Sequence, residues 1–398
     1  MANKKREYKP KYLKRQKKAS KGETLGTVLV LAVAVVCTVL SVNMMGTVVQ
    51  GAASASGSGA SAARDLALMD RFDMNMTNSV AQALDGVVTI ERVYWLSDDD
   101  LIAPKPNPDC SGRTNDPASL QWLLDEAEKT LGVTDTLFST DVKLMAGSEI
   151  SYYLDQTIMV ISWQQEIHGA AYTFSEVKIA HPSQFRRFLA DGAYGSAKQY
   201  LTTEMAATVN AVTASSGDFY KFRSNGVMVY NGDVYRNDST VDTCYISEDG
   251  NMIFSRAGEI SSKAQAEKFV EENNIRFSLA FGPILVENGQ ICNEDVNKRY
   301  PIGEGTTRYS RAGLGQLGEL HYVLVAANLI PGAEKGTPTM AMFAEQMYSF
   351  GCQNAYALDG GQTAAIVTNG KLINRPDWGY QRQISDIIYF ATALPEED

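Results

Sequence analysis

The chain has 398 residues, of which 44% are apolar and 21% are charged, and its formal net charge is −10. This length gives room for two or three folded domains, and the composition excludes disordered, collagen-like and disulfide-stapled classes. Residues 1–23 carry a net charge of +8, which leaves −18 for the rest of the chain. Because affinity for nucleic acid depends mainly on Lys and Arg, we expect no nucleic-acid partner for this acidic part. Three histidines in all argue against a three-His zinc site.

A long uncharged segment follows the basic N-terminus. No charged residue occurs between Glu23 and Arg64, and the apolar residues 25–49 are numerous enough to cross a bilayer as a helix. The positive-inside rule then predicts that residues 1–24 form a cytoplasmic tail and that the rest lies outside the cytoplasm. We therefore predict a single-pass protein of the cell membrane with an uncleaved signal anchor. A cleavable signal peptide is the alternative, because small residues follow the span.

Two segments connect this span to the main domain. Residues 50–63 are small and polar, which predicts a flexible linker. Residues 64–150 contain two helical patterns, and the second is expected to begin at Ser119 after the proline-rich loop 101–117. We predict a helical stalk or adaptor here, without residues that indicate chemistry.

From residue 151 onward the pattern is that of a β-rich domain. Residues 157–163 form a β-prone run, and three Asn-Gly pairs, at Asn231, Asn288 and Asn369, lie between alternating segments. Asn-Gly between strands predicts a hairpin, because a type I′ turn needs positive φ at both central residues.

Two helices are expected to interrupt these strands. One covers residues 261–273, and the other runs from Thr337 as cap, with Pro338 at its first position, to Gly351. Strands, hairpins and packed helices together predict an α+β fold with a mixed or antiparallel sheet over residues 151–398. Four cysteines in the exported part are expected to be mostly buried apolar thiols, with one disulfide as the alternative. They are Cys110, Cys244, Cys292 and Cys352.

Two aspartates are candidates for chemistry. Asp359 follows an expected strand at residues 354–358 and precedes Gly360 and Gly361, which permit a sharp turn and close approach to a ligand. Asp218 lies among aromatic residues directly before Arg223 and the first hairpin. An ordinary turn aspartate is the alternative for each.

Cationic residues near these motifs suit an anionic ligand. Arg311 stands just before an expected Gly-rich turn, and Arg382 lies near the C-terminus. Guanidinium groups bind phosphate or carboxylate in a bidentate manner. Surface ion pairs are the alternative. Residues 313–318 match G-x-G-x-x-G, but a strand pattern follows instead of a helix, so we reject a dinucleotide site.

Seven stretches share their order and spacing with one family. They are TTEMAATVNA, SGDFY with the hairpin NGDVYR, FSLAFGPILVENGQ, SRAGLGQ, the helix before FGC, ALDGG, and VTNGKLINRP followed by QRQISDIIYF. Together these stretches resemble the phosphodiester glycosidases, the family of the lysosomal uncovering enzyme, over about residues 170–392.

The resemblance implies hydrolysis of the bond between an anomeric carbon and a phosphodiester oxygen, which uses carboxyl groups for proton transfer and cations to hold phosphate. It implies Asp359 as the first catalytic carboxylate and Asp218 as the second, with Glu345 in place of an acid that the family carries at the position of Met342. The implied substrate-binding residues are Arg311, Arg382, Gly360, Gly361, Arg223 and Thr363. No cofactor is expected; a divalent cation would be compatible with the acids near the motifs, but the sequence does not demand one.

We therefore predict an extracytoplasmic phosphodiester glycosidase that acts on a phosphate-containing glycan of the cell envelope or an exopolysaccharide. The alternative is a catalytically silent glycan-binding or scaffold ectodomain in envelope polysaccharide assembly. Loss of the family's Asn and Ser, at the positions of Ser216 and Thr363, favours that alternative. The retained Asp359, Asp218 and Arg311 favour the enzyme. The sequence indicates no protein partner.

Overall fold

The computed structural model describes residues 96, 102–218, 220–292 and 305–394. The expected cytoplasmic tail, membrane span and linker lie outside these residues, as does most of the first half of the expected adaptor. Within the part of the chain that is described, no helix is long and apolar enough to span a membrane. The membrane anchor therefore stays a prediction.

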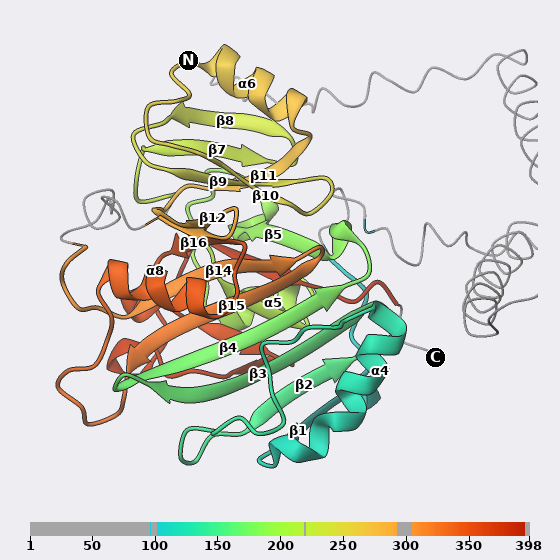
Figure 1. Cartoon of the computed structure of the whole chain (residues 1–398). Helices are drawn as coiled ribbons and strands as arrows, with labels where there is room; N and C mark the ends of the chain where they lie inside the picture. The colour runs from blue at the N-terminus through green and yellow to red at the C-terminus, as the bar shows by residue number, and fades with distance from the viewer. Residues whose placement is uncertain (1–95, 97–101, 219, 293–304, 395–398) are drawn as a thin grey trace, which may run out of the picture. The chain divides into compact units, whose positions relative to one another are not determined.

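The largest sheet is antiparallel and contains nine strands among the described residues, in the order β1-β2-β3-β4-β15-β14-β16-β12-β13 (Figure 1). Its strands are β1 (Ser111–Thr114), β2 (Ile150–Leu154), β3 (Ile158–Ile167), β4 (Ala170–Ile179), β12 (Ile284–Glu287), β13 (Gln290–Ile291), β14 (Arg311–Gly318), β15 (His321–Leu329) and β16 (Asn354–Leu358). Alternation along β15 gives the sheet two apolar faces. Val323 and Val325 enter the core on one face, and Tyr322 and Leu324 enter the core on the other.

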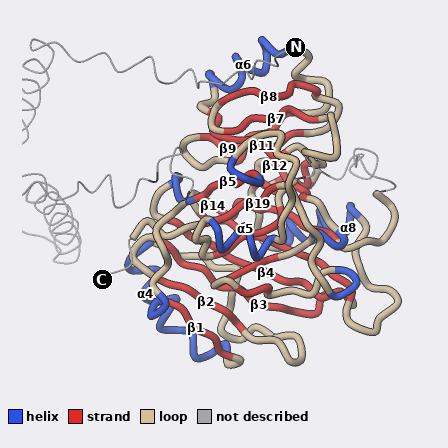
Figure 2. The backbone as a smooth tube through the Cα atoms, turned by 180° about the vertical axis from the view of Figure 1, so that it is seen from behind, coloured by secondary structure: helices blue, strands red, loops and turns tan. Residues whose placement is uncertain are grey.

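Helices cover the first face. The apolar sides of α4 (Gln121–Leu131) and α8 (Met340–Ser349) join Trp163 and Phe174 of the sheet in one core cluster. The other face packs against a second sheet of five strands among the described residues, ordered β18-β17-β6-β19-β5. These strands are β5 (Phe185–Leu189), β6 (Thr213–Ser216), β17 (Ile366–Thr368), β18 (Lys371–Leu372) and β19 (Asp386–Phe390). Helix α5 (Thr202–Thr208) covers its outer side, which gives four layers in the order α/β/β/α (Figure 2).

A smaller group of strands carries its own core. It contains a hairpin of β7 (Gly226–Tyr230) and β8 (Asp233–Asp238), a sheet of β10 (Met252–Ser255), β9 (Thr243–Ser247) and β11 (Ile275–Leu279), and helix α6 (Lys263–Glu272). Short 3-10 helices connect the elements of the domain. They are η2 (Pro108–Cys110), η3 (Pro117–Leu120), η4 (Pro182–Gln184), η5 (Ala190–Gly192), η6 (Gly361–Thr363) and η7 (Asp377–Gly379).

The expected α+β class and the three Asn-Gly hairpins are confirmed. The turns join β7 to β8, β12 to β13 and β17 to β18. Their asparagines, Asn231, Asn288 and Asn369, have φ of 49°, 52° and 50°, and each following glycine also has positive φ. This is the backbone that a type I′ turn requires.

The predicted separate adaptor is wrong for its described residues. Strand β1 pairs with β2 at the edge of the nine-stranded sheet, and Leu123 and Ala127 of α4 are fully buried in the core with Trp163. Segment 102–150 is therefore part of the main domain. The polar sequence of β1 hid this, because an edge strand needs no alternating apolar side chains.

Local details of the helices also differ from the expectations. Helix α8 begins after Thr339, whose hydroxyl accepts from the Met342 N–H at 3.2 Å, and not after Thr337. The start of α4 is preceded by η3, which Asp116 caps instead of Ser119. Helix α6 lies within the expected range 261–273, and Ser262 caps it. None of the four described cysteines forms a disulfide, so the disulfide alternative is wrong for them.

The stretch 313–318 is a strand and not a Gly-rich turn. A Cβ at Gly313 would lie 3.0 Å from the Phe343 ring, and one at Gly315 would lie 2.4 Å from the Cys352 Sγ. The glycines therefore allow α8 and the segment after it to pack closely on β14.

Candidate active site

Asp359 lies directly after β16, and its backbone N–H donates to the carbonyl oxygen of Gly217 at 3.4 Å. Gly217 directly follows β6 of the other sheet. The two motifs, LDGG and SGDFY, are therefore adjacent in space although about 140 residues separate them in the chain. Strand ends from two packed sheets meet at this point.

The electrostatics of Asp359 favour proton transfer. Burial raises the pKa of Asp359 to about 6, while the Thr363 hydroxyl and the charges of Arg382 and Arg223 oppose the increase. The negative charge of Asp218 adds to the increase. The side chain stays half-buried, so solvent and ligand have access to it. A carboxylate with a pKa near 6 is a stronger base than a free aspartate and is mostly ionised at pH 7.

Two arginines lie within electrostatic reach of this carboxylate. Arg382 is exposed and its guanidinium lies 5.7 Å from the centre of the Phe222 ring. Arg223 is half-buried and lies 5.6 Å from the centre of the Phe281 ring. Aromatic contacts of this kind fix the direction of a guanidinium. The structure thus places the charges of Arg223 and Arg382 where they act on Asp359.

The two glycines after Asp359 are required by close packing. A Cβ at Gly360 would lie 2.4 Å from the Ser310 carbonyl oxygen, and one at Gly361, which has φ +66°, would lie 2.7 Å from the Tyr309 ring. The Gly361 N–H donates to Ser310 at 2.9 Å. The Thr363 hydroxyl donates to the Gly360 carbonyl at 2.6 Å. These contacts hold the turn against the start of β14.

Asp218, the predicted second carboxylate, is buried, and both of its carboxylate oxygens accept hydrogen bonds from the protein. Its Oδ1 accepts from the Tyr220 N–H at 2.7 Å and pairs with Nη2 of Arg187 at 2.9 Å. Its Oδ2 accepts from the Ala280 N–H at 2.7 Å. Asp218 is 4% exposed. It influences Asp359 through its charge, but its oxygens are committed to the protein.

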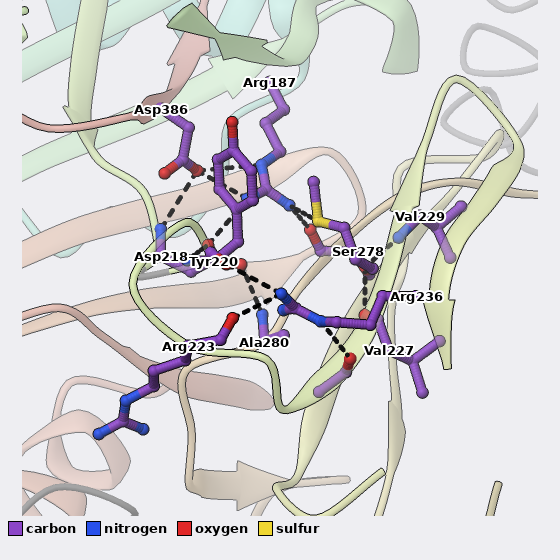
Figure 3. Close-up of polar contacts among 12 residues, drawn as sticks. Arg187, Asp218, Tyr220, Arg223, Val227, Val229, Arg236, Ser278, Ala280 and Asp386 are labelled. Atoms are coloured by element: carbon purple, nitrogen blue, oxygen red, sulfur yellow. Dashed lines mark hydrogen bonds and ion pairs between the residues drawn. The ribbon is translucent and has the colours of Figure 1, made fainter. Parts of the chain in front are cut away.

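Sequence reasoning missed the partners of Asp218, which are Arg187 on β5 and Asp386 on β19. Figure 3 shows the guanidinium of Arg187 between the two carboxylates, with the Arg223 side chain pointing away from this group. Arg187 Nη2 lies 2.8 Å from Asp386 Oδ2, which also accepts from the Asp218 N–H at 3.2 Å. Burial and the negative charge of Asp218 raise the pKa of Asp386 to about 7, against the opposing charge of Arg187. A usable signal was present: Arg186-Arg187 and Asp386 are charged residues inside otherwise apolar strands.

Arg311 and Glu345, two other predicted site residues, point away from Asp359 or bind other groups. The Arg311 guanidinium is buried and donates to the carbonyl oxygens of Thr307 and Pro338 at 2.7 and 3.5 Å. Glu345 is exposed on α8, on the opposite side from the residues that pack on the sheet. Neither side chain has a described contact with Asp359. Among the described residues, no group of three or more His, Cys, Asp or Glu is arranged to hold a metal ion.

Comparison with known proteins identifies this part of the chain. Residues 207–391, which contain Asp218, Asp359 and Arg382, match the family model for phosphodiester glycosidases. Less than half of the chain is matched, and this part is similar to phosphodiester glycosidases. The resemblance drawn from the sequence motifs is thereby confirmed.

Two solved structures match parts of the chain at low sequence identity. The catalytic domain of zebrafish N-acetylglucosamine-1-phosphodiester alpha-N-acetylglucosaminidase, auto-inhibited by its pro-peptide, is 18% identical with a TM-score of 0.49, and the match covers 59% of this chain and 83% of that chain. A hypothetical protein from Synechocystis is 14% identical with a TM-score of 0.42, and the match covers 63% of this chain and 64% of that chain. No curated protein matches the chain.

Proposed function

We propose that this phosphodiester glycosidase domain hydrolyses the bond between the anomeric carbon of a sugar and a phosphodiester oxygen. The observation that carries the proposal is the position of Asp359, a carboxylate with a pKa of about 6, within reach of the positive charges of Arg223 and Arg382. A carboxylate that transfers protons and cations that hold a phosphate are the two components that this reaction needs.

The chemistry assigns Asp359 the role of base. A phosphate monoester is a good leaving group, so the water that attacks the anomeric carbon needs more assistance than the departing oxygen. Asp359 takes a proton from this water, the water oxygen bonds to the anomeric carbon, and the bond from that carbon to the phosphate oxygen breaks. The electron pair remains on the phosphate, where Arg223 and Arg382 stabilise the charge.

The test is hydrolysis of a sugar-1-phosphate diester by the purified protein. Release of free sugar by the wild type is expected, and Asp359→Asn should lower kcat by about 10³-fold while its circular dichroism spectrum stays that of the wild type. Turnover by the Asn variant at the wild-type rate would remove Asp359 from the mechanism.

A second function, glycan binding without turnover, is favoured by one observation. Asp218 is occupied by two backbone N–H groups and Arg187, so it does not offer the second carboxylate that most glycosidases use. Calorimetric titration with a sugar phosphodiester, run beside the hydrolysis assay, separates the two functions. Heat of binding without released sugar supports this second function.

We also propose that the domain works outside the cytoplasm on a phosphate-containing glycan of the cell envelope or an exopolysaccharide. The support is the sequence pattern of a basic segment followed by the apolar residues 25–49. Protease added to intact cells should digest the domain, and protection from the protease until the cells are lysed would contradict this orientation.

A further inference from the structure

Two arginines that act on Asp359 both depend on one short loop, residues 220–226, which leads into β7. Arg223 belongs to this loop, and its positive charge acts on the carboxyl group of Asp359. Phe222 belongs to it as well and is 46% exposed, and the centre of its ring lies 5.7 Å from the guanidinium of Arg382, the second cation. The position of the loop therefore influences where both positive charges lie.

Arg236 of β8 binds this loop through three backbone carbonyl groups. Its Nη1 donates to the carbonyl oxygen of Tyr220 at 2.8 Å and to that of Arg223 at 2.6 Å (Figure 3). Its Nε donates to the carbonyl oxygen of Gly226 at 3.0 Å. The three acceptors span the loop from its first residue to its last. One guanidinium can bind them all because its N–H groups diverge in a single plane.

The half-buried Arg236 side chain is not placed there by an ion pair. Among the described residues no carboxylate pairs with its guanidinium, and its buried Nη2 has no hydrogen-bond partner. A buried donor without an acceptor lowers stability. The contacts that offset this cost are the three bonds to the loop, so the guanidinium is committed to holding the loop.

The side chain of Arg223 is held at its other end by a different element. Its guanidinium lies 5.6 Å from the centre of the ring of Phe281, which follows β11 and is fully buried. Arg236 thus fixes the backbone of Arg223, and Phe281 orients the charged group. Fixing both ends of a side chain lowers the entropy that the side chain loses when it binds a ligand.

We propose that Arg236 is a positioning residue of the candidate active site, which holds loop 220–226 so that Arg223 and Arg382 face the phosphate group of the substrate. This inference rests on the proposed function and extends the site to β8, in the smaller group of strands. Arg236 does not touch the substrate. It fixes the two cations before the substrate binds, and cations held in advance stabilise a developing charge best.

The first test is a double-mutant cycle in the hydrolysis assay with the full chain. Arg236→Met removes all three hydrogen bonds to the loop and should lower kcat/KM about tenfold, because a misplaced cation stabilises the transition state less. Arg223→Met should lower kcat/KM by at least as much. Because Arg236 acts largely through Arg223, the loss in the double variant should be smaller than the product of the two single losses. A loss equal to that product would contradict the proposal.

The pH dependence of kcat/KM gives a readout that a purely structural role of Arg236 would not change. The charges that act on Asp359 are those of Arg223 and Arg382, which lower its pKa, and that of Asp218, which raises it. When Arg236→Met lets Arg223 move away, the midpoint of the profile should shift upward by about 0.5 pH unit. An unchanged midpoint would overturn the inference.

Arg236→Lys separates the charge of Arg236 from its shape. Lysine keeps the positive charge but has a single nitrogen, which cannot reproduce the planar arrangement of donors. We therefore expect the midpoint to shift in the same direction as in Arg236→Met, and this variant carries the test if Arg236→Met does not fold. Wild-type kcat/KM and midpoint in Arg236→Lys would contradict a role that depends on the three hydrogen bonds.

Arg276→Met is the matched control. Arg276 of β11 is 8% exposed and donates to the carbonyl oxygens of Pro182 and Phe185 at 3.0 and 3.1 Å, outside loop 220–226. This variant also loses bonds from a guanidinium to the backbone, so it should lower the melting temperature while the midpoint of the pH profile stays that of the wild type. An equal shift in Arg276→Met and Arg236→Met would indicate general loosening and overturn the inference.

If the wild type releases no sugar, the proposed hydrolysis fails, but the role of Arg236 can still be judged. NMR titration of the full chain, with carbon-13 in the aspartate carboxyl groups, follows Asp359 directly, and Asp359→Asn identifies its signal. The titration midpoint of Asp359 should be higher in Arg236→Met and in Arg223→Met than in the wild type. Equal midpoints in the wild type and Arg236→Met would contradict the positioning role.

Discussion

The Cα of Gly217 packs directly against the carboxylate of Asp386, so that a Cβ on Gly217 would lie 2.0 Å from Oδ2. The absence of a side chain at this position lets β19 approach the turn after β6. Oδ2 of Asp386 can then accept from the Asp218 N–H and bind Arg187 at the same time. The glycine of the SGDFY motif thus serves the buried charge network beneath the candidate site.

Gly217→Ala should destabilise the domain by about 3 kcal/mol, because the new methyl group overlaps a fully buried carboxylate that cannot move without breaking an ion pair. Gly318→Ala is the control, since Gly318, like Gly217, does not have a positive φ and a Cβ there has no neighbour within 4 Å. Urea unfolding should show a lower midpoint for the first variant and a change below about 0.5 kcal/mol for the second. Equal midpoints would contradict the packing argument.

Substitution of Arg187 should lower the free energy of unfolding much more than substitution of Asp386. Arg187→Met leaves two buried carboxylates without their cation and should cost about 3–5 kcal/mol of unfolding free energy. Asp386→Asn keeps the pair of Arg187 with Asp218 and should cost about 1 kcal/mol at pH 5. A larger loss in Asp386→Asn than in Arg187→Met would refute this division of roles.

The stability of the wild type should also depend on pH through Asp386. The pKa of Asp386 in the folded state is about 7, above its unfolded value, so the folded state binds more protons between pH 4 and pH 7. This group therefore makes the free energy of unfolding decrease as pH increases across that window. Asp386→Asn should remove that contribution, and thermal melts at pH 4.5 and 7.5 measure it.

The raised pKa of Asp359 predicts how kcat/KM depends on pH. Because the carboxylate acts as a base and its pKa is raised by burial to about 6, kcat/KM should increase with pH and level off above about pH 7. An activity that falls as pH increases through 6 would instead assign Asp359 the role of acid.

Asp359→Asn should also stabilise the fold at pH 8 by about 1–2 kcal/mol, because it removes the cost of an ionised, half-buried carboxylate.

Arg382 and Arg311 were both predicted to bind the substrate, but we expect substitution of Arg382 to lower activity and substitution of Arg311 to lower stability. Arg382→Ala removes an exposed cation that acts on Asp359 and should lower kcat/KM by about 10–100-fold with little change in melting temperature. Arg311→Ala removes the donor to two backbone carbonyls and should lower stability by about 2–3 kcal/mol. Loss of stability in the first variant and not in the second would reverse the assignment.

Local features could be read from the sequence where a single short segment decides them. Asn-Gly turns formed hairpins because their backbone demands positive φ, and the helix α8 was recognised because it ends before Gly351. Asp359 could be recognised because its motif, a strand followed by two glycines, is contiguous. Order and spacing of the motifs identified the family.

The sequence alone could not place residues that act across the two sheets. Asp218 and Asp359 each stand next to a glycine in the sequence. Only tertiary packing decides that Arg187 and backbone N–H groups bind the carboxylate of Asp218, while the carboxylate of Asp359 stays half-buried. The pKa of a carboxyl group and the direction of a guanidinium depend on neighbours from distant strands. Those neighbours are determined by strand pairing and sheet packing, which join segments far apart in the chain. A local sequence pattern therefore cannot predict them.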